Sequence, residues 1–101
     1  MVKIENKRTE IPFTEDTKAT YADLIKILVN QPIREGLTVA QIRRDFLILD
    51  AVSDSNVESF ELEETQLKHV AALSEDAQWP VRHMDVVAFS DYLNELVNEL
   101  K

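Results

Sequence analysis

The sequence predicts a mainly α-helical fold with a minor β component, on three observations. Apolar residues recur at steps of three and four along four stretches, roughly residues 20–30, 38–52, 64–77 and 83–100. Two shorter stretches alternate instead between apolar and polar side chains, as strands do: residues 1–13 and 57–63. The chain has 101 residues and is 45% hydrophobic, which is the size and composition of one folded domain. We therefore expect a single domain over residues 1–101.

Residues 1–13 admit two interpretations. Apolar residues flank the polar pair Asn6-Lys7, which is the pattern of a small β-hairpin. Its second arm would lie at a sheet edge, because Pro12 has no N–H to donate to a ladder. The alternative is that residues 1–17 form a flexible terminal arm.

Two of the predicted helices begin with a capping box. Asp23 follows Thr20 by three residues, and Gln41 follows Thr38 by the same step. At this spacing each side chain bonds a backbone group that the first helical turn leaves unpaired. Gly36 lets the chain turn into the second of these helices without steric cost.

The helix over residues 38–52 carries the widest apolar stripe. Four of its side chains repeat at steps of three and four and three more widen the stripe: Val39, Ile42, Phe46 and Leu49, then Leu47, Ile48 and Val52. A helix at the surface needs an apolar stripe on one side only. We therefore expect this helix to lie at the centre of the fold, covered on more than one side.

The segment after this helix is predicted to be a strand. Phe60 and Leu62 alternate with acidic residues, so one face of the strand is apolar. The strand is a candidate to pair with the N-terminal segment. Prolines mark two helix ends, because the residue before a proline disfavours the helical conformation: Pro32 after residues 20–30 and Trp79-Pro80 after residues 64–77.

The helix over residues 83–100 has the cleanest periodicity. Five side chains follow steps of three and four, the spacing of a coiled-coil seam: Val86, Phe89, Leu93, Leu96 and Leu100. A second apolar flank gives the helix more surface than one neighbour covers. We therefore predict this seam as the interface for a second copy or another protein, the alternative being an ordinary core helix.

The net charge of −8 is concentrated in the second half of the chain. Residues 1–50 hold eight basic and eight acidic residues, whereas residues 51–101 hold three basic and eleven acidic residues. Such a charge repels nucleic acid phosphates and anionic membranes, and favours a basic partner. The alternative is a solvated acidic face that serves solubility.

Five charged residues are candidates for contact with a partner: Arg43, Arg44, Glu61, Glu63 and Glu64. The two arginines are expected to meet the acidic half of the chain or of a second copy. The three glutamates belong to the acidic stretch that would present carboxylates to a basic partner.

The composition argues against an enzyme. One glycine excludes the glycine-rich loops that cradle phosphates, and the absence of cysteine excludes disulfides, zinc thiolates and cysteine nucleophiles. His69 and His83 are the only imidazoles, and neither stands at a recognisable metal-ligand spacing. We expect no catalytic residue, no metal site and no cofactor.

The segment GLTVAQIRR is superficially similar to the opening of a helix-turn-helix. That motif continues with a short turn and a basic recognition helix, whereas this chain continues into an acidic strand. The acidic continuation disfavours a small DNA-binding regulator, which is kept as an alternative.

The N-terminus lacks the apolar core of a secretory signal, and no apolar run is long enough for a membrane span. We expect a protein without membrane contact, located in the cytoplasm.

The order and spacing of several segments resemble small accessory proteins of tailed bacteriophages and prophages. The segments are TYADLI, QPIREGLT, IRRDFLILDAV, FELEETQLKHVAAL and WPVRHMDVVAF, and they span most of residues 18–95. The resemblance implies a viral accessory protein without enzymatic activity that acts by binding other proteins.

Three functions follow as hypotheses. The first is a phage or prophage accessory protein that self-associates and binds a phage or host protein in particle assembly, in the bacterial cytoplasm or on the virion. The second is an acidic inhibitor that mimics nucleic acid in a host protein. The third is the DNA-binding regulator.

Overall fold

The computed structural model describes residues 1–31, 35–79 and 82–100. The elements follow one another as β1 (Val2–Glu5), β2 (Arg8–Pro12), β3 (Lys18–Thr20), α1 (Tyr21–Val29), α2 (Val39–Ala51), β4 (Ser59–Leu62), α3 (Glu64–Asp76) and α4 (Met84–Glu99). The four predicted helices are confirmed, and each begins and ends within one residue of the predicted bounds. Pro32 and Pro80, the predicted helix breakers, lie outside the described residues.

Both predicted capping boxes are formed. The Thr20 hydroxyl accepts from the backbone N–H of Asp23 at 3.4 Å, and the Asp23 carboxylate accepts from the N–H of Thr20 at 2.9 Å. Thr38 and Gln41 exchange the same two bonds at 3.2 and 2.9 Å. Gly36 has a φ of 80°, a left-handed conformation that side chains other than glycine rarely adopt. The local sequence therefore fixes the start of α2.

The strands form two small antiparallel sheets, β1 with β4 and β2 with β3. The predicted hairpin between the two arms of residues 1–13 is wrong, because β1 and β2 each pair with a later segment. Val2 lies opposite Leu62 and Ile4 opposite Phe60, which confirms that residues 57–63 pair with the N-terminal segment. The pairing gives the first residues of the chain a place in the core, where Ile4 is fully buried.

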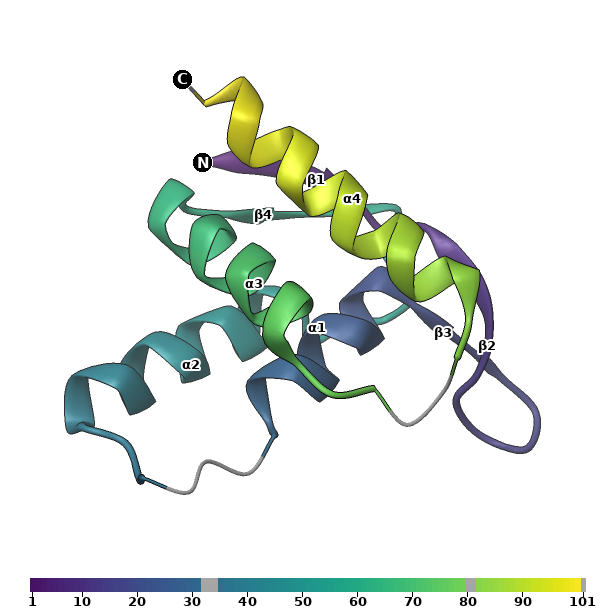
Figure 1. Cartoon of the computed structure of the whole chain (residues 1–101), viewed down its shortest axis with the longest axis horizontal. Helices are drawn as coiled ribbons and strands as arrows, with labels where there is room; N and C mark the ends of the chain where they lie inside the picture. Colours follow the sequence, from purple (N-terminus) through teal and green to yellow (C-terminus); the bar gives the residue numbers. More distant parts are fainter. Residues whose placement is uncertain (32–34, 80–81, 101) are drawn as a thin grey trace.

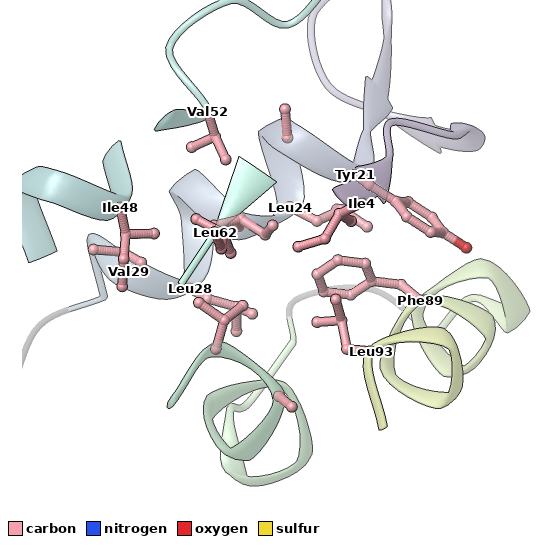
Figure 2. Close-up of a cluster of buried hydrophobic side chains, with 14 of the residues drawn as sticks. Ile4, Tyr21, Leu24, Leu28, Val29, Ile48, Val52, Leu62, Phe89 and Leu93 are labelled. Atoms are coloured by element: carbon pink, nitrogen blue, oxygen red, sulfur yellow. The ribbon is translucent and has the colours of Figure 1, made fainter. Parts of the chain in front are cut away.

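The core lies between the β1–β4 sheet and the helices. Phe89 and Leu93 of α4 point toward Ile4 of β1 and Tyr21 of α1 (Figure 2). α4 also packs along α3, and α1 contacts α2, α3 and β3 (Figure 1). The Cα radius of gyration is 13.1 Å, as expected for a compact chain of this length.

The central helix is α1, so the prediction that the helix over residues 38–52 is central is wrong. Seven of the nine residues of α1 are buried, whereas Ile48 is the only buried residue within α2. α2 contacts α1 and β4 through its C-terminal half, where Ile48 and the following Val52 enter the core (Figure 2). Its other side has no neighbour among the described residues to cover it.

No helix in the described part of the chain is long and apolar enough to cross a lipid bilayer.

Candidate interaction surface

The outer side of α2 is the largest group of exposed apolar side chains in the described residues. Val39, Phe46 and Leu47 are 64%, 63% and 59% exposed, and Ile42 is 38% exposed. Leu37, directly before the helix cap, is exposed as well. In Figure 1 the N-terminal end of α2 lies at the edge of the molecule and its C-terminal end lies near α1. Apolar patches of this kind are typical of surfaces that bind another molecule.

Two charged residues lie among these apolar side chains. At 100° per residue, Val39, Ile42, Arg43, Phe46, Leu47 and Asp50 fall within an arc of roughly 140° of the helix surface. Ile48 and Val52, which are fully buried, lie on the opposite side. We call these six residues the α2 face.

The charges of the α2 face differ from the other charges of α2 in their partners. Arg44 forms an ion pair with Asp45 at 3.1 Å, and the Asp45 carboxylate lies 3.8 Å from Nε2 of His69 on α3. Arg43 and Asp50 are exposed and form no ion pair with any other described residue. Their charges are therefore available to a partner.

His69 connects α3 to this ion pair at the inner side of α2. Burial lowers the pKa of the imidazole below its ordinary value of 6.5, and the Arg44 guanidinium lowers the pKa further. The Asp45 carboxylate acts in the opposite direction and does not outweigh them. His69 is thus mainly neutral near pH 7 and serves as a packed polar contact between α3 and α2.

The structure places the predicted seam of α4 against the chain's own core. Phe89 and Leu93 are fully buried and Val86 is 9% exposed, while Leu96 and Leu100 are half-buried against the same core. The ring centroids of Tyr21 and Phe89 lie 5.0 Å apart in an edge-to-face contact. These side chains leave little apolar surface for a second molecule. Self-association through this seam stays a prediction.

Four of the five predicted partner-contact charges have a local structural role, whereas Arg43 forms no ion pair with a described residue. The role of Arg44 is its ion pair with Asp45. Glu61 lies opposite Lys3 in the β1–β4 register, where opposite charges attract. Glu63 is the N-cap of α3, and its backbone N–H donates to the Gln66 side chain at 2.9 Å. Glu64 occupies the first turn of α3, where a carboxylate interacts favourably with the helix dipole.

A polar network around Asp23 is the strongest competing site. The buried Asp23 carboxylate accepts from the Ser55 hydroxyl and from the backbone N–H of Thr20. The Lys26 ammonium donates to the Ser55 hydroxyl at 2.8 Å and to the Ser53 carbonyl at 3.0 Å. Asn6 joins the same network by donating to the carbonyls of Ser55 and Val57.

This network fixes three segments of the chain to one another. The Ser55 hydroxyl donates to the Asp23 carboxylate and accepts from the Lys26 ammonium, so both of these groups hold it in place. An open groove of about 1010 Å³ runs beside the network, lined mainly by polar side chains. The arrangement is that of a satisfied structural junction between Asn6 after β1, helix α1 and the segment before β4.

The two histidines have structural partners. His83 is the N-cap of α4, where its Nδ1 accepts from the backbone N–H of Asp85 at 3.0 Å, and His69 faces Asp45. Across residues 1–31, 35–79 and 82–100, no three carboxylate or imidazole side chains are grouped closely enough to hold a metal ion.

The periodicity of residues 38–52 predicts a covered surface for Val39, Ile42, Phe46 and Leu47 and does not single out Asp50. The signal that could have found the face is the position of Arg43 and Asp50, seven residues apart and on the same side as those four apolar residues. Two charges within an apolar stripe indicate a side that meets water or a charged partner.

No family model, curated protein or solved structure in the comparisons matches the chain.

Proposed function

We propose that the chain is a non-enzymatic module that binds a protein partner through the α2 face. The observation that supports this proposal is the row of exposed apolar side chains on a helix whose start is fixed by its cap. Exposing such a row in a monomer is unfavourable, since each of these side chains gains about 1.5–3 kcal/mol when it is fully buried. A partner that covers the row recovers part of this energy.

The resemblance to accessory proteins of tailed phages and prophages supplies the proposed setting. The partner would then be a phage or host protein met during particle assembly, in the bacterial cytoplasm or on the virion. Binding by an apolar helix face is a recognised mode in which a helix inserts its exposed row into a groove of the partner.

A photo-reactive residue at position 46 tests the proposal in cells that carry the source phage. We expect a crosslinked protein, whose affinity for the purified chain then falls more than about tenfold in Phe46→Asp, because a carboxylate replaces the central apolar contact. Val87→Asp is the matched control, because Val87 is an exposed apolar residue of α4 outside the face. Equal affinities for the two variants would refute the role of the α2 face.

The acidic mimic of nucleic acid remains a second candidate, on a different surface. Asp91, Glu95 and Glu99 are exposed along α4, and α4 carries no basic residue. A partner that binds these carboxylates would lose affinity steeply as salt rises, whereas binding to the apolar row would change little. A mobility-shift titration at low salt tests the DNA-binding alternative, for which we expect no complex.

A further inference from the structure

We propose that the partner of the α2 face is the α2 face of a second copy of this chain, packed antiparallel across a two-fold axis. The proposal rests on the proposed function, that this face binds protein. It differs from the self-association predicted from the sequence, which used the side chains that α4 buries in its own core.

The first argument is the distribution of charge over the surface. The chain carries a net charge of −8, all of it in residues 51–101, so two copies repel one another where these residues meet. α4 holds four acidic residues and no basic one, and α3 holds three acidic residues and one basic one. α2 holds two of each sign, so its net charge is zero. A second copy therefore approaches α2 against less repulsion than it meets at α3 or α4.

The second argument is that the α2 face is complementary to itself. Arg43 and Asp50 lie on the same face, about 10.5 Å apart along the helix axis, and neither forms an ion pair with another described residue. A parallel pair of α2 helices in register would place like charges together. In an antiparallel pair, Arg43 of each copy lies opposite Asp50 of the other. This is an isologous contact, the type that a two-fold dimer requires.

The charge pairs also fix the register of the two helices. When Arg43 of one copy lies opposite Asp50 of the other, the two-fold axis passes between Phe46 and Leu47. The side chains of these two residues are among the most exposed of the face. These apolar side chains then meet their counterparts at the centre of the contact, with an Arg43–Asp50 pair on each side. Charged residues within an apolar helix contact are known to specify register in this way.

A contact made mainly by one helix from each copy lies at the small end of stable interfaces. We therefore expect a dimer with a dissociation constant on the order of micromolar, and a monomer–dimer equilibrium that is visible by sedimentation. We expect Arg43→Glu and Asp50→Arg each to weaken the dimer by at least about tenfold, because each brings like charges together. The double variant R43E/D50R restores opposite charges and should recover most of the affinity.

Two controls separate this pairing from a general effect of net charge. Lys68→Glu on α3 changes the net charge as Arg43→Glu does, and Asp91→Arg on α4 changes it as Asp50→Arg does; both residues are exposed. These controls should leave the dissociation constant within about twofold, because they lie outside the contact. Circular dichroism of each variant checks that it remains folded.

The result that overturns the inference is a wild-type chain that stays monomeric at millimolar concentration, or a folded double variant that does not recover the loss of the single variants. Phe46→Asp distinguishes this failure from a failure of the proposed function. If the wild type is monomeric and Phe46→Asp still loses a crosslinked partner, the α2 face binds another protein and only the two-fold pairing is wrong. If Phe46→Asp changes neither dimer nor partner binding, both proposals are wrong.

Discussion

α2 and α4 carry similar apolar patterns and have opposite surroundings. Both have apolar side chains at steps of three and four, and both begin with a side-chain cap. α4 packs along α3 and inserts Phe89 and Leu93 into the core, whereas α2 inserts Ile48 and leaves Phe46 in solvent. The difference shows that periodicity identifies a helix and its apolar stripe, while the neighbours of the helix decide whether the stripe is covered.

The comparison breaks down if the two phenylalanines contribute equally to folding. We expect Phe89→Ala to lower the free energy of unfolding by about 3–5 kcal/mol, because it leaves a cavity in the core. Phe46→Ala should change it by less than about 0.5 kcal/mol, because the ring is exposed. Urea unfolding of dilute protein, below the concentration at which it dimerises, measures both values. Similar losses for the two variants would mean that α2 is covered by its own chain.

The attachment of α2 by its C-terminal half gives a second, smaller difference. Thr38→Ala removes the side-chain cap of α2 and should lower the stability of the helix by about 1 kcal/mol. The N-terminal half of α2 has few contacts to hold it, so the lost stability should appear locally. We expect faster amide hydrogen exchange at Gln41 and Ile42. The amides of α4 around Phe89 should keep their protection. An equal loss of protection in α4 would show that the two helices open as one unit.

The burial of His69 beside Arg44 gives the smallest effect, a dependence of stability on pH. The folded-state pKa of His69 lies below its ordinary value of 6.5, so the folded chain binds fewer protons than the unfolded chain in this range. The contribution of His69 to the free energy of unfolding is therefore fully present above pH 6.5, and it is lost as the pH drops from 6.5 toward the folded-state pKa.

Comparison with His69→Gln isolates this effect from the titration of the carboxylates. We expect the melting temperature of the wild type to fall more than that of the variant between pH 7 and pH 5.5. Parallel melting curves over this range would show that folding does not lower the pKa of His69.

Most of the helical structure could be predicted from local signals. Thr20 with Asp23 and Thr38 with Gln41 mark the starts of α1 and α2, and the structure contains both capping boxes. The pairing of β1 with β4 follows from the candidate that the sequence offers, whereas the pairing of β2 with β3 does not, because the three residues of β3 are too few to show the alternation of a strand.

The candidate site could be predicted only in part. The sequence predicts Arg43 as a partner-contact charge, but it places Phe46 in the covered centre of the fold. The reason is that an apolar stripe looks the same whether the molecule covers it or a partner does. α1, with a shorter pattern, takes the central place because strands and helices surround it.

The measurement that tests the central claim most directly is the solvent exposure of the Phe46 and Phe89 rings. NMR of protein with labelled phenylalanine, in the presence of a soluble paramagnetic agent, reports both rings among the four phenylalanines of the chain. In dilute protein we expect strong broadening of Phe46 and little of Phe89. At high concentration, the Phe46 signal should become protected as the dimer forms. A Phe46 ring that is already protected in dilute, monomeric protein would contradict the account.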